Sequence, residues 1–502
     1  MNLASHPILT CDEARDFEEK LLGGDEAREW PALQAAGRAI AGAVLADFEE
    51  IGGFPPNGRL LVLVGKGHNG GDALLAARTI IEKFPTTCAE IVFVFGERVL
   101  RPLAARAWRE LAQVAGARVA VGEISDLADQ TTGLAYRYDL VIGGVFGFQF
   151  RPPLDADVSV LFARVNALPI RLRAAVDLPS GLGEPNAFRA DFTYATGSLK
   201  TPLLTLPNAG RVRYLDLGFF NGDEPGTDRV LTTDVLAPLR GLRSTHTDKR
   251  SHGHLLVVGG SLQYPGAVLM SVLAALRSGV GLVTAFVPES LAAAFAARAP
   301  EAMWVGCPVT EGGGLALEGM HLVRERLERA SALLIGPGLG REAETLTLVA
   351  EILKTTMQPV VLDADALQPE IVRGGKAPRV LTPHAGEFGR IAEGKAPREF
   401  AASSGTTLVL KGPVTSITDG RTTWHSFYGG PVLARGGSGD VLAGLVGGLL
   451  AQTPGDLSGA AARGVVWHGR AADLLARSHG QVSVTVTQLL DFLSTALRTE
   501  GP

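Results

Sequence analysis

A glycine-rich turn near the end of the chain, at residues 435–439, leads through Asp440 into the apolar run VLAGLVGGLL. The run is typical of a buried helix, and the N–H groups of such a turn and helix start can bind phosphate oxygens. A carboxylate at this point can act as a general base that deprotonates a hydroxyl attacking the terminal phosphate of a nucleotide. It can equally complement the helix dipole without doing chemistry. On this motif alone, both interpretations stay open.

Polar and glycine-rich segments follow several other predicted strands of the same half. They are GPGLG (336–340), LDADAL (362–367), LTPHAGEF (381–388) and LKGPVTSI (410–417). A lone His or Asp in such a segment is more often structural than functional. Ligands of open parallel sheets bind at the carboxyl ends of the strands, however, so the succession of segments predicts one shared site.

A second glycine-rich turn, GKGHNGGDAL (65–74), lies between the apolar run RLLVLV and a helical pattern. Its glycines permit tight turns and close approach of a ligand. We expect Asp72 in the first helical turn, where it can complement the dipole or accept ribose hydroxyls. Asn69 can coordinate a hard cation or cap the helix. The turn matches neither the P-loop nor the G-x-G-x-x-G fingerprint, and a plain tight turn with a capping Asp is the alternative.

The elements that position these residues alternate between strands and helices. Residues 11 to 54 show helical periodicity, and a first series of strands and helices follows them. A second series begins at HLLVVGGS and ends in the helix after Asp440. Apolar strands alternating with helices predict the α/β class, with mostly parallel sheets covered on both faces. The polar segment around 221–251 interrupts the pattern and predicts two domains, 1–222 and 245–502, joined by a linker at 223–244.

The composition excludes several classes of protein. The chain has 502 residues, of which 46% are hydrophobic and 20% charged, so it is long enough for two globular domains. A net charge of −5 offers no basic surface for nucleic acid or an anionic membrane. The apolar stretches are too short to span a bilayer, and the N-terminus lacks the basic start of a signal peptide. Three widely spaced cysteines argue against disulfides and zinc sites. We expect a soluble, cytoplasmic protein.

The ordered motifs of the second half resemble the dehydratase that repairs the hydrated nucleotides NADHX and NADPHX. They run from GGS (259–261) and YPGA (264–267) through the four segments above to GGSGDVLAG. The resemblance covers roughly residues 245–500 and implies a ribokinase-like three-layer domain that uses ADP or ATP with Mg²⁺. Bacterial members fused in this way typically use ADP, and eukaryotic members use ATP. It implies Asp440 as the catalytic base, substrate binding by Ala267, Gly338 and His384, and nucleotide binding by Lys411, Gly412, Pro413, Val414, Thr415 and Gly439.

Residues 10–220 resemble the epimerase that interconverts the R and S forms of the same hydrates. The family's loop reads close to G-N-G-N-N-G-G-D-G, and VDLPSGL (176–182) and FGFQFRPPL (146–154) match two further motifs. The resemblance implies a Rossmann-like three-layer domain with Asp177 as a catalytic residue and a potassium site at Asn69 and Ser180. It implies substrate binding by Asn69, Gly70, Gly71, Asp72, Gly147, Phe148, Gln149, Phe150 and Arg151.

One position of the potassium site departs from the family. Gly143 stands where the family has an Asp, so the site loses its formal negative charge and keeps neutral ligands. The first half is therefore either an epimerase or a non-catalytic module that binds a dinucleotide or a partner. For the second half, the alternative is a small-molecule kinase of the same fold. We expect the partners to be NADHX and NADPHX, with no nucleic acid or membrane, and the chain to form a homo-oligomer.

Overall fold

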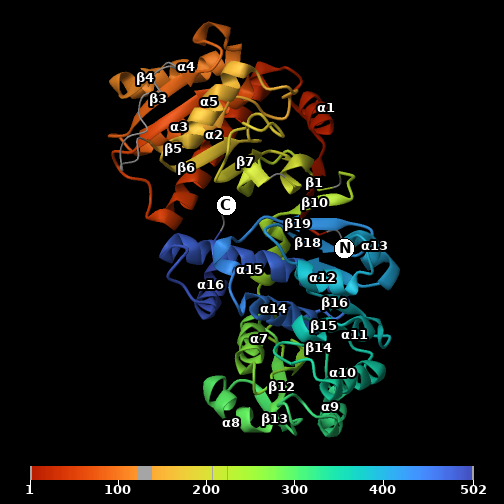
Figure 1. Ribbon diagram of the computed structural model, residues 1–502. Helices are drawn as coiled ribbons and strands as arrows, with labels where there is room; N and C mark the ends of the chain where they lie inside the picture. Colours follow the sequence, from red (N-terminus) through yellow and green to blue (C-terminus); the bar gives the residue numbers. More distant parts are fainter. Residues whose placement is uncertain (1–2, 123–137, 206, 223, 500–502) are drawn as a thin grey trace. The chain divides into compact units, whose positions relative to one another are not determined.

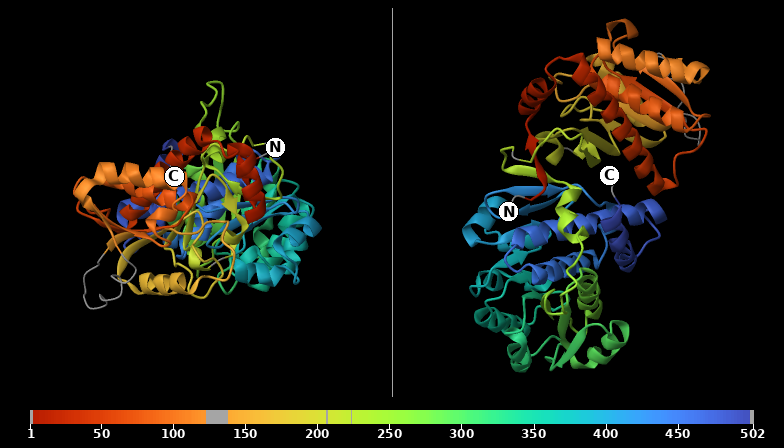
Figure 2. Two further views of the ribbon diagram at one scale, coloured as in Figure 1. Left: turned by 90° about the horizontal axis from the view of Figure 1, so that it is seen from above. Right: turned by 180° about the vertical axis from the view of Figure 1, so that it is seen from behind.

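The computed structural model describes residues 3–122, 138–205, 207–222 and 224–499. The chain forms two compact units, whose main segments are His6–Pro225 and Gly226–Leu475. Both units are built from alternating strands and helices, as Figures 1 and 2 show. The prediction of a two-domain α/β protein is confirmed. Every helix among these residues is too short or too polar to cross a bilayer.

The N-terminal unit is built on a parallel sheet with the strand order β4-β3-β2-β5-β6-β7-β9. A short parallel pair joins β1 and β8. The elements are β1 (Ser5–Leu9), α1 (Cys11–Leu22), α2 (Glu26–Phe48), β2 (Arg59–Val64), α3 (His68–Lys83), β3 (Cys88–Phe93), α4 (Pro102–Ala115), β4 (Val119–Val121), β5 (Tyr138–Gly144), α5 (Ala156–Ala167), β6 (Ile170–Val176), β7 (Phe192–Thr196), β8 (Leu199–Lys200) and β9 (Arg211–Leu215).

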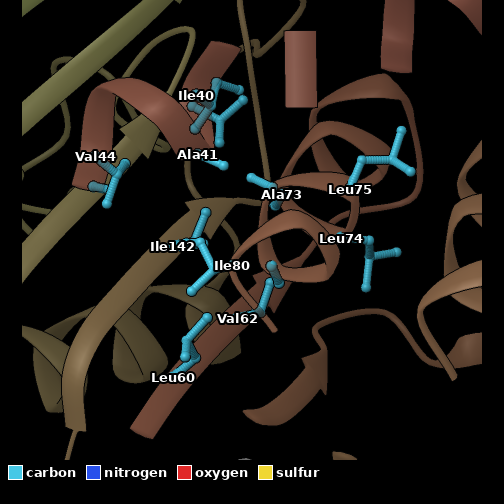
Figure 3. Close-up of a cluster of buried hydrophobic side chains, with 14 of the residues drawn as sticks. Ile40, Ala41, Val44, Leu60, Val62, Ala73, Leu74, Leu75, Ile80 and Ile142 are labelled. Carbon is cyan, nitrogen blue, oxygen red and sulfur yellow. The ribbon is translucent and has the colours of Figure 1, made fainter. Parts of the chain in front are cut away.

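Side chains of both faces of this sheet are buried, which explains the continuous apolar strands in the sequence. One face packs against α2, α3 and α4. Figure 3 shows part of this cluster, in which Ile40 and Val44 of α2 and Ile80 of α3 lie near Val62 and Ile142 of the strands. The other face packs against α5. Two helical layers around one sheet give the three-layer arrangement predicted for this half.

The C-terminal unit contains a longer sheet, in which the order β13-β12-β11-β14-β15-β16-β17-β18-β19-β10 lies within the unit. The strands from β13 to β17 are parallel, and β17, β18 and β19 form antiparallel pairs. The strands are β10 (Asp228–Leu231), β11 (His254–Val258), β12 (Leu282–Pro288), β13 (Met303–Cys307), β14 (Ala332–Ile335), β15 (Val360–Leu362), β16 (Arg379–Leu381), β17 (Thr407–Leu410), β18 (Thr415–Thr418) and β19 (Thr423–Ser426).

Helices cover both faces of this second sheet. Apolar side chains of α9, α10 and α11 pack on one face, and α7 and α14 contact the strands from the other. Helices α14 and α7 lie side by side (Figure 1). The helices are α6 (Ala237–Arg240), α7 (Pro265–Arg277), α8 (Glu289–Arg298), α9 (Met320–Leu327), α10 (Ala343–Thr355), α11 (Pro369–Arg373), α12 (Ala385–Ile391), α13 (Pro397–Ser404), α14 (Ser438–Gln452), α15 (Leu457–His479) and α16 (Val486–Arg498).

The segment interpreted as a linker, 223–244, differs from that expectation. Its described part holds strand β10, which pairs in parallel with β19, and helix α6. These residues cluster with the C-terminal unit from Gly226 onward. The strand is only four residues long and has polar neighbours, so its periodicity is too weak to be recognised without its partner strand.

Candidate active sites

The glycine-rich turn of the N-terminal unit is itself helical. Helix α3 begins at His68, with Gly67 as its N-cap, so Asp72 lies beyond the first turn and is buried. The expectation that Asp72 sits in the first turn is wrong, and so is the alternative of a capping Asp. Asn69 does not cap the helix; its amide donates a hydrogen bond to the Val176 carbonyl at 3.0 Å. The side chains of the turn are therefore directed by tertiary packing rather than by capping.

Glycine is required in this turn because α3 packs directly on the backbone at the ends of two strands. A methyl group at Gly70 would overlap the Gly65 carbonyl oxygen, and one at Gly144 would overlap the Asn69 carbonyl oxygen. Gly71 in turn faces the side chain of Leu33. Gly70 and Gly71 thus lie behind the site and serve close packing, rather than facing the cavity described below.

Gly70→Ala is expected to destabilise the N-terminal unit by about 3 kcal/mol, because the added methyl group has no space. The temperature at which limited proteolysis cleaves this unit should fall by roughly 6–12 °C. Gly42→Ala is the matched control, since nothing lies within 4 Å of the position of its methyl group. A Gly70→Ala protein as resistant as the control would contradict the packing argument.

A cavity of about 490 Å³ opens beside the start of α3. Its lining contains most residues predicted for substrate binding in this half, namely Asn69, Asp72, Gly147, Phe148, Gln149, Phe150 and Arg151, together with Asp177, which was predicted as catalytic. The Arg151 guanidinium donates to the carbonyls of Phe148 and Phe150 and so holds the loop in shape. The structure therefore brings together residues that three separate sequence motifs contribute.

Charged groups gather at the wall of this cavity. Lys200 is 1% exposed and donates to Asp177 Oδ1 at 2.5 Å, and its Nζ lies 3.8 Å from Glu18 Oε1. Burial alone would lower the pKa of Lys200, but the carboxylates of Asp177 and Glu18 outweigh burial and raise it. Burial, with the nearby charges of Asp177 and Glu18, raises the pKa of Asp72 well above its ordinary value.

Lys200 and Glu18 escaped the sequence analysis. Lys200 is a lone charged residue, whereas Glu18 is one of several charged residues in the segment 12–20, and neither belongs to a glycine-rich motif. The one available signal for Lys200 was a lysine inside the otherwise apolar run SLKTPLL. Asp177, which was predicted, has φ of 62°, a conformation uncommon for a residue other than glycine and often found at functional sites.

The residues predicted for potassium do not fit that ion in this structure. Ser180 is buried, and its hydroxyl both accepts from the Phe146 N–H at 2.9 Å and donates to the Phe146 carbonyl at 3.1 Å. A side chain at Gly143 would meet the buried ring of Phe188, 2.9 Å from the Cβ position. The described residues also contain no group of three acidic, His or Cys side chains able to hold a metal. Gly143 therefore supplies no carboxylate for the cation, and the Ser180 hydroxyl already makes two hydrogen bonds to the backbone.

The second candidate site begins at the N-terminal end of α14. The helix starts at Ser438 after Gly437, whose φ of 96° is in the left-handed region, and Asp440 lies in the first turn as predicted. The Ser271 hydroxyl of α7 donates to the Asp440 carbonyl at 2.9 Å. Helix α7 therefore holds the start of α14 in place through this hydrogen bond. The first backbone N–H groups of α14 have no partner within the helix and point outward from its N-terminal end.

Asp440 is surrounded by charges. Its carboxyl has a pKa raised to about 7: burial raises it most, the charge of Asp363 raises it as well, and Lys411 acts in the opposite direction. Lys411 Nζ donates to Asp363 Oδ1 at 3.0 Å and would lie 3.1 Å from a methyl group on Gly439. An ammonium group thus stands against the glycine turn, next to a carboxyl group that changes protonation near neutral pH.

His384 is placed by its own helix. Its Nδ1 accepts hydrogen bonds from the N–H groups of Gly386 and Glu387 at 3.0 and 3.3 Å, as the N-cap of α12. This leaves Nε2 as the ring atom at the exposed side; the side chain is 60% exposed. A backbone bridge joins His384 to Lys411, so two predicted residues from neighbouring strand ends lie together.

Ala267 and Gly338 also meet, although they lie 71 positions apart in the sequence. A methyl group on Gly338 would lie 3.0 Å from Ala267 Cβ and would overlap the Tyr264 carbonyl oxygen. Gly340 of the same loop donates to Asp365, whose charge acts on Asp440. Residues 411–414 form the turn between β17 and β18, and β18 begins at Thr415. Within the described part of the chain, no hydrogen bond or ion pair joins residues 412–415 to Asp440.

Two parallel sheets with polar clusters at their strand ends define an α/β enzyme with two separate sites, one of them suited to phosphate. The family described as NAD(P)H-hydrate dehydratase matches residues 255–495, and that described as YjeF-related protein N-terminus matches residues 32–201. The chain belongs to the family of bifunctional NAD(P)H-hydrate repair enzymes, as its near full-length similarity to curated members shows.

Two of these relatives and one solved structure illustrate the similarity. The repair enzyme of Gloeobacter violaceus is 38% identical, over 94% of this chain and 94% of the relative, and that of Moorella thermoacetica is 33% identical over 93% and 92%. The ADP/ATP-dependent NAD(P)H-hydrate dehydratase of Bacillus subtilis, co-crystallized with ATP/Mg²⁺, is 30% identical. It covers 51% of this chain and 93% of its own, with a TM-score of 0.45.

Proposed function

We propose that this chain repairs hydrated NADH and NADPH. The C-terminal unit dehydrates the S form of NAD(P)HX at the expense of ADP or ATP, and the N-terminal unit interconverts the R and S forms. Membership of the repair-enzyme family supports both activities. The observation that carries the dehydratase assignment is Asp440, a half-buried carboxyl group beside Lys411 and the glycine turn.

In the dehydration, Asp440 is the general base. Its carboxylate accepts the proton of the hydroxyl on the hydrated nicotinamide ring while the hydroxyl oxygen attacks the terminal phosphorus of the nucleotide. The N–H groups at 437–439 and the Lys411 ammonium stabilise the charge on the transferred phosphoryl group. The ring nitrogen then expels phosphate and the neighbouring carbon loses a proton, which restores NAD(P)H. The overall change consumes one phosphoanhydride bond for each hydrate.

The other residues of this unit would bind the reactants. We assign substrate contacts to Ala267, Gly338 and His384, and nucleotide contacts to Gly439 and to Lys411 with the turn at 412–415. Mg²⁺ would accompany the nucleotide, as in the crystals of the B. subtilis enzyme. The phosphate oxygens would supply its principal ligands.

Turnover of separated stereoisomers tests the proposal. We expect purified protein with ADP or ATP to convert S-NADHX to NADH, detected by absorbance, and to consume R-NADHX faster than its spontaneous epimerisation allows. A stable phosphorylated product without NADH would instead indicate a small-molecule kinase. Consumption of the S form alone would remove the epimerase assignment and leave the dehydratase.

Potassium is expected to make no difference to epimerisation. Ser180 is hydrogen-bonded to the Phe146 backbone, and Phe188 occupies the space beside Gly143, so the site lacks the carboxylate that would attract the cation most strongly. The rate with the R form should be equal, within twofold, in potassium and in sodium chloride at matched ionic strength. A strong potassium activation of the unsubstituted protein would contradict this prediction.

The location and assembly of the protein are also proposals. All three cysteines are free thiols, as suits a reducing cytoplasm, where the NAD(P)H pool resides. Light scattering of the purified protein would test the expected homo-oligomer.

A further inference from the structure

The cavity of the N-terminal unit contains a charged pair that the family motifs do not include. Glu18 of α1 and Lys200 of β8 both line it, together with Asp177. They come from opposite ends of the N-terminal sequence, and only folding brings them together. The role inferred below for Glu18 and Lys200 rests on the epimerase function proposed above.

The three groups form a row in which the amine lies between two acids. Lys200 Nζ is 2.5 Å from Asp177 Oδ1 and 3.8 Å from Glu18 Oε1, and it also lies 5.1 Å from the centre of the Phe148 ring. Asp177 Oδ2 has no hydrogen-bond partner among the described atoms. The Glu18 side chain is 25% exposed, against 4% for Asp177, so it is the more open end of the row.

The carboxyl group of Glu18 can exchange a proton near neutral pH. Its pKa is raised to about 7, mainly by burial; the Lys200 ammonium lowers it in part, and the Asp177 charge adds to the rise. Asp72, which is buried against the same cluster, is the further acid that faces this group. A carboxyl group with these surroundings is poised between the acid and base forms that proton transfer to a hydroxyl requires.

We propose that Glu18 is a catalytic acid–base residue of the epimerisation, and that Lys200 is a positioning residue that passes protons between Glu18 and Asp177. Glu18 gives its proton to the hydroxyl of the hydrated ring, and the carbon–oxygen bond breaks with its electron pair leaving as water. The ring nitrogen's lone pair forms a double bond to that carbon. Water adds to the opposite face, and Asp177 accepts the released proton.

The cycle closes through Lys200. Its ammonium group gives a proton to the Glu18 carboxylate and takes the one held by Asp177, so that all three groups return to their starting states. No oxidant, reductant or second substrate is needed, because the water lost and the water gained balance. Lys200 suits this transfer because its Nζ is hydrogen-bonded to Asp177 and lies 3.8 Å from Glu18 Oε1.

Glu18→Gln tests the assignment in the full-length protein. We expect kcat for epimerisation of R-NADHX to fall about 10²–10⁴-fold with little change in KM, because the amide keeps the shape of the side chain but cannot exchange the proton. The unsubstituted protein should lose kcat/KM as pH rises above about 7, where Glu18 is deprotonated, and Glu18→Gln should lack this limb. Glu18→Asp should retain it at a reduced rate.

Two controls separate the possible failures. Glu19→Gln changes the exposed neighbour on the same helix and should leave epimerisation unchanged, and dehydration of the S form should be normal in every variant. Lys200→Met should lower kcat as well, without abolishing substrate binding in the cavity. Wild-type kcat and pH profile in Glu18→Gln would overturn the proposal. Absence of epimerisation by the unsubstituted protein would overturn the proposed function itself, which the same assay reveals.

Discussion

Asp440→Asn is expected to lower kcat for dehydration of S-NADHX by about 10²–10⁴-fold while epimerisation continues at the normal rate. The amide has the shape of the carboxyl group, so the helix start and its bond from Ser271 to the backbone should persist. What is lost is the group that accepts the hydroxyl proton. The measurement is NADH formation from the separated S form under saturating nucleotide.

The pH dependence of kcat in the unsubstituted enzyme provides a second test of Asp440 as the general base. Because burial and Asp363 raise the pKa of Asp440 to about 7, the base is protonated below that pH, and kcat should fall as pH drops through 7. Asp440→Asn should lack this limb. The matched control is Asp491→Asn on α16, whose side chain is 70% exposed and which should leave rate and profile unchanged. Equal losses in both variants would point to a general effect on folding.

The sequence predicted the main strands and the Asp440 motif because both depend on local pattern. Runs such as RLLVLV are apolar throughout, which marks a strand buried on both faces, and the glycine turn with a following apolar helix is short and contiguous. The start of α3 was misjudged for a physical reason. Glycines are poor helix formers, so HNGG was interpreted as a turn. In the structure these residues begin α3, because Gly70 packs closely on Gly65 and this tertiary contact outweighs the low helix propensity of glycine.

Two kinds of feature lay beyond sequence reasoning. The partnership of Glu18 with Lys200 depends on burial and on distance in space, which no spacing in the sequence encodes. The same holds for Gly143: its lack of a carboxylate is visible in the sequence, but the ring of Phe188 beside it is not. The first observation is the basis of the role proposed for Glu18, and the second is the basis of the expected independence from potassium.

Lys411→Met should weaken nucleotide binding in the C-terminal site, with the KM for ADP or ATP rising about 10- to 100-fold. The ammonium group stands against Gly439 at the glycine turn and bonds to Asp363, so its removal takes away the positive charge nearest the expected phosphate. Lys354→Met, at a side chain that is 64% exposed, is the control and should leave KM unchanged.

Lys411 and Asp363 should also shift the pH profile of dehydration in opposite directions. Lys411 lowers the pKa of Asp440 and Asp363 raises it, so Lys411→Met should move the limb near pH 7 to higher pH, and Asp363→Asn should move it to lower pH. General damage to the site would lower the rates of both variants without opposite shifts. Limbs that stay in place in both variants would show that Asp440 is not the group whose titration controls the rate, and the general-base assignment would then fail.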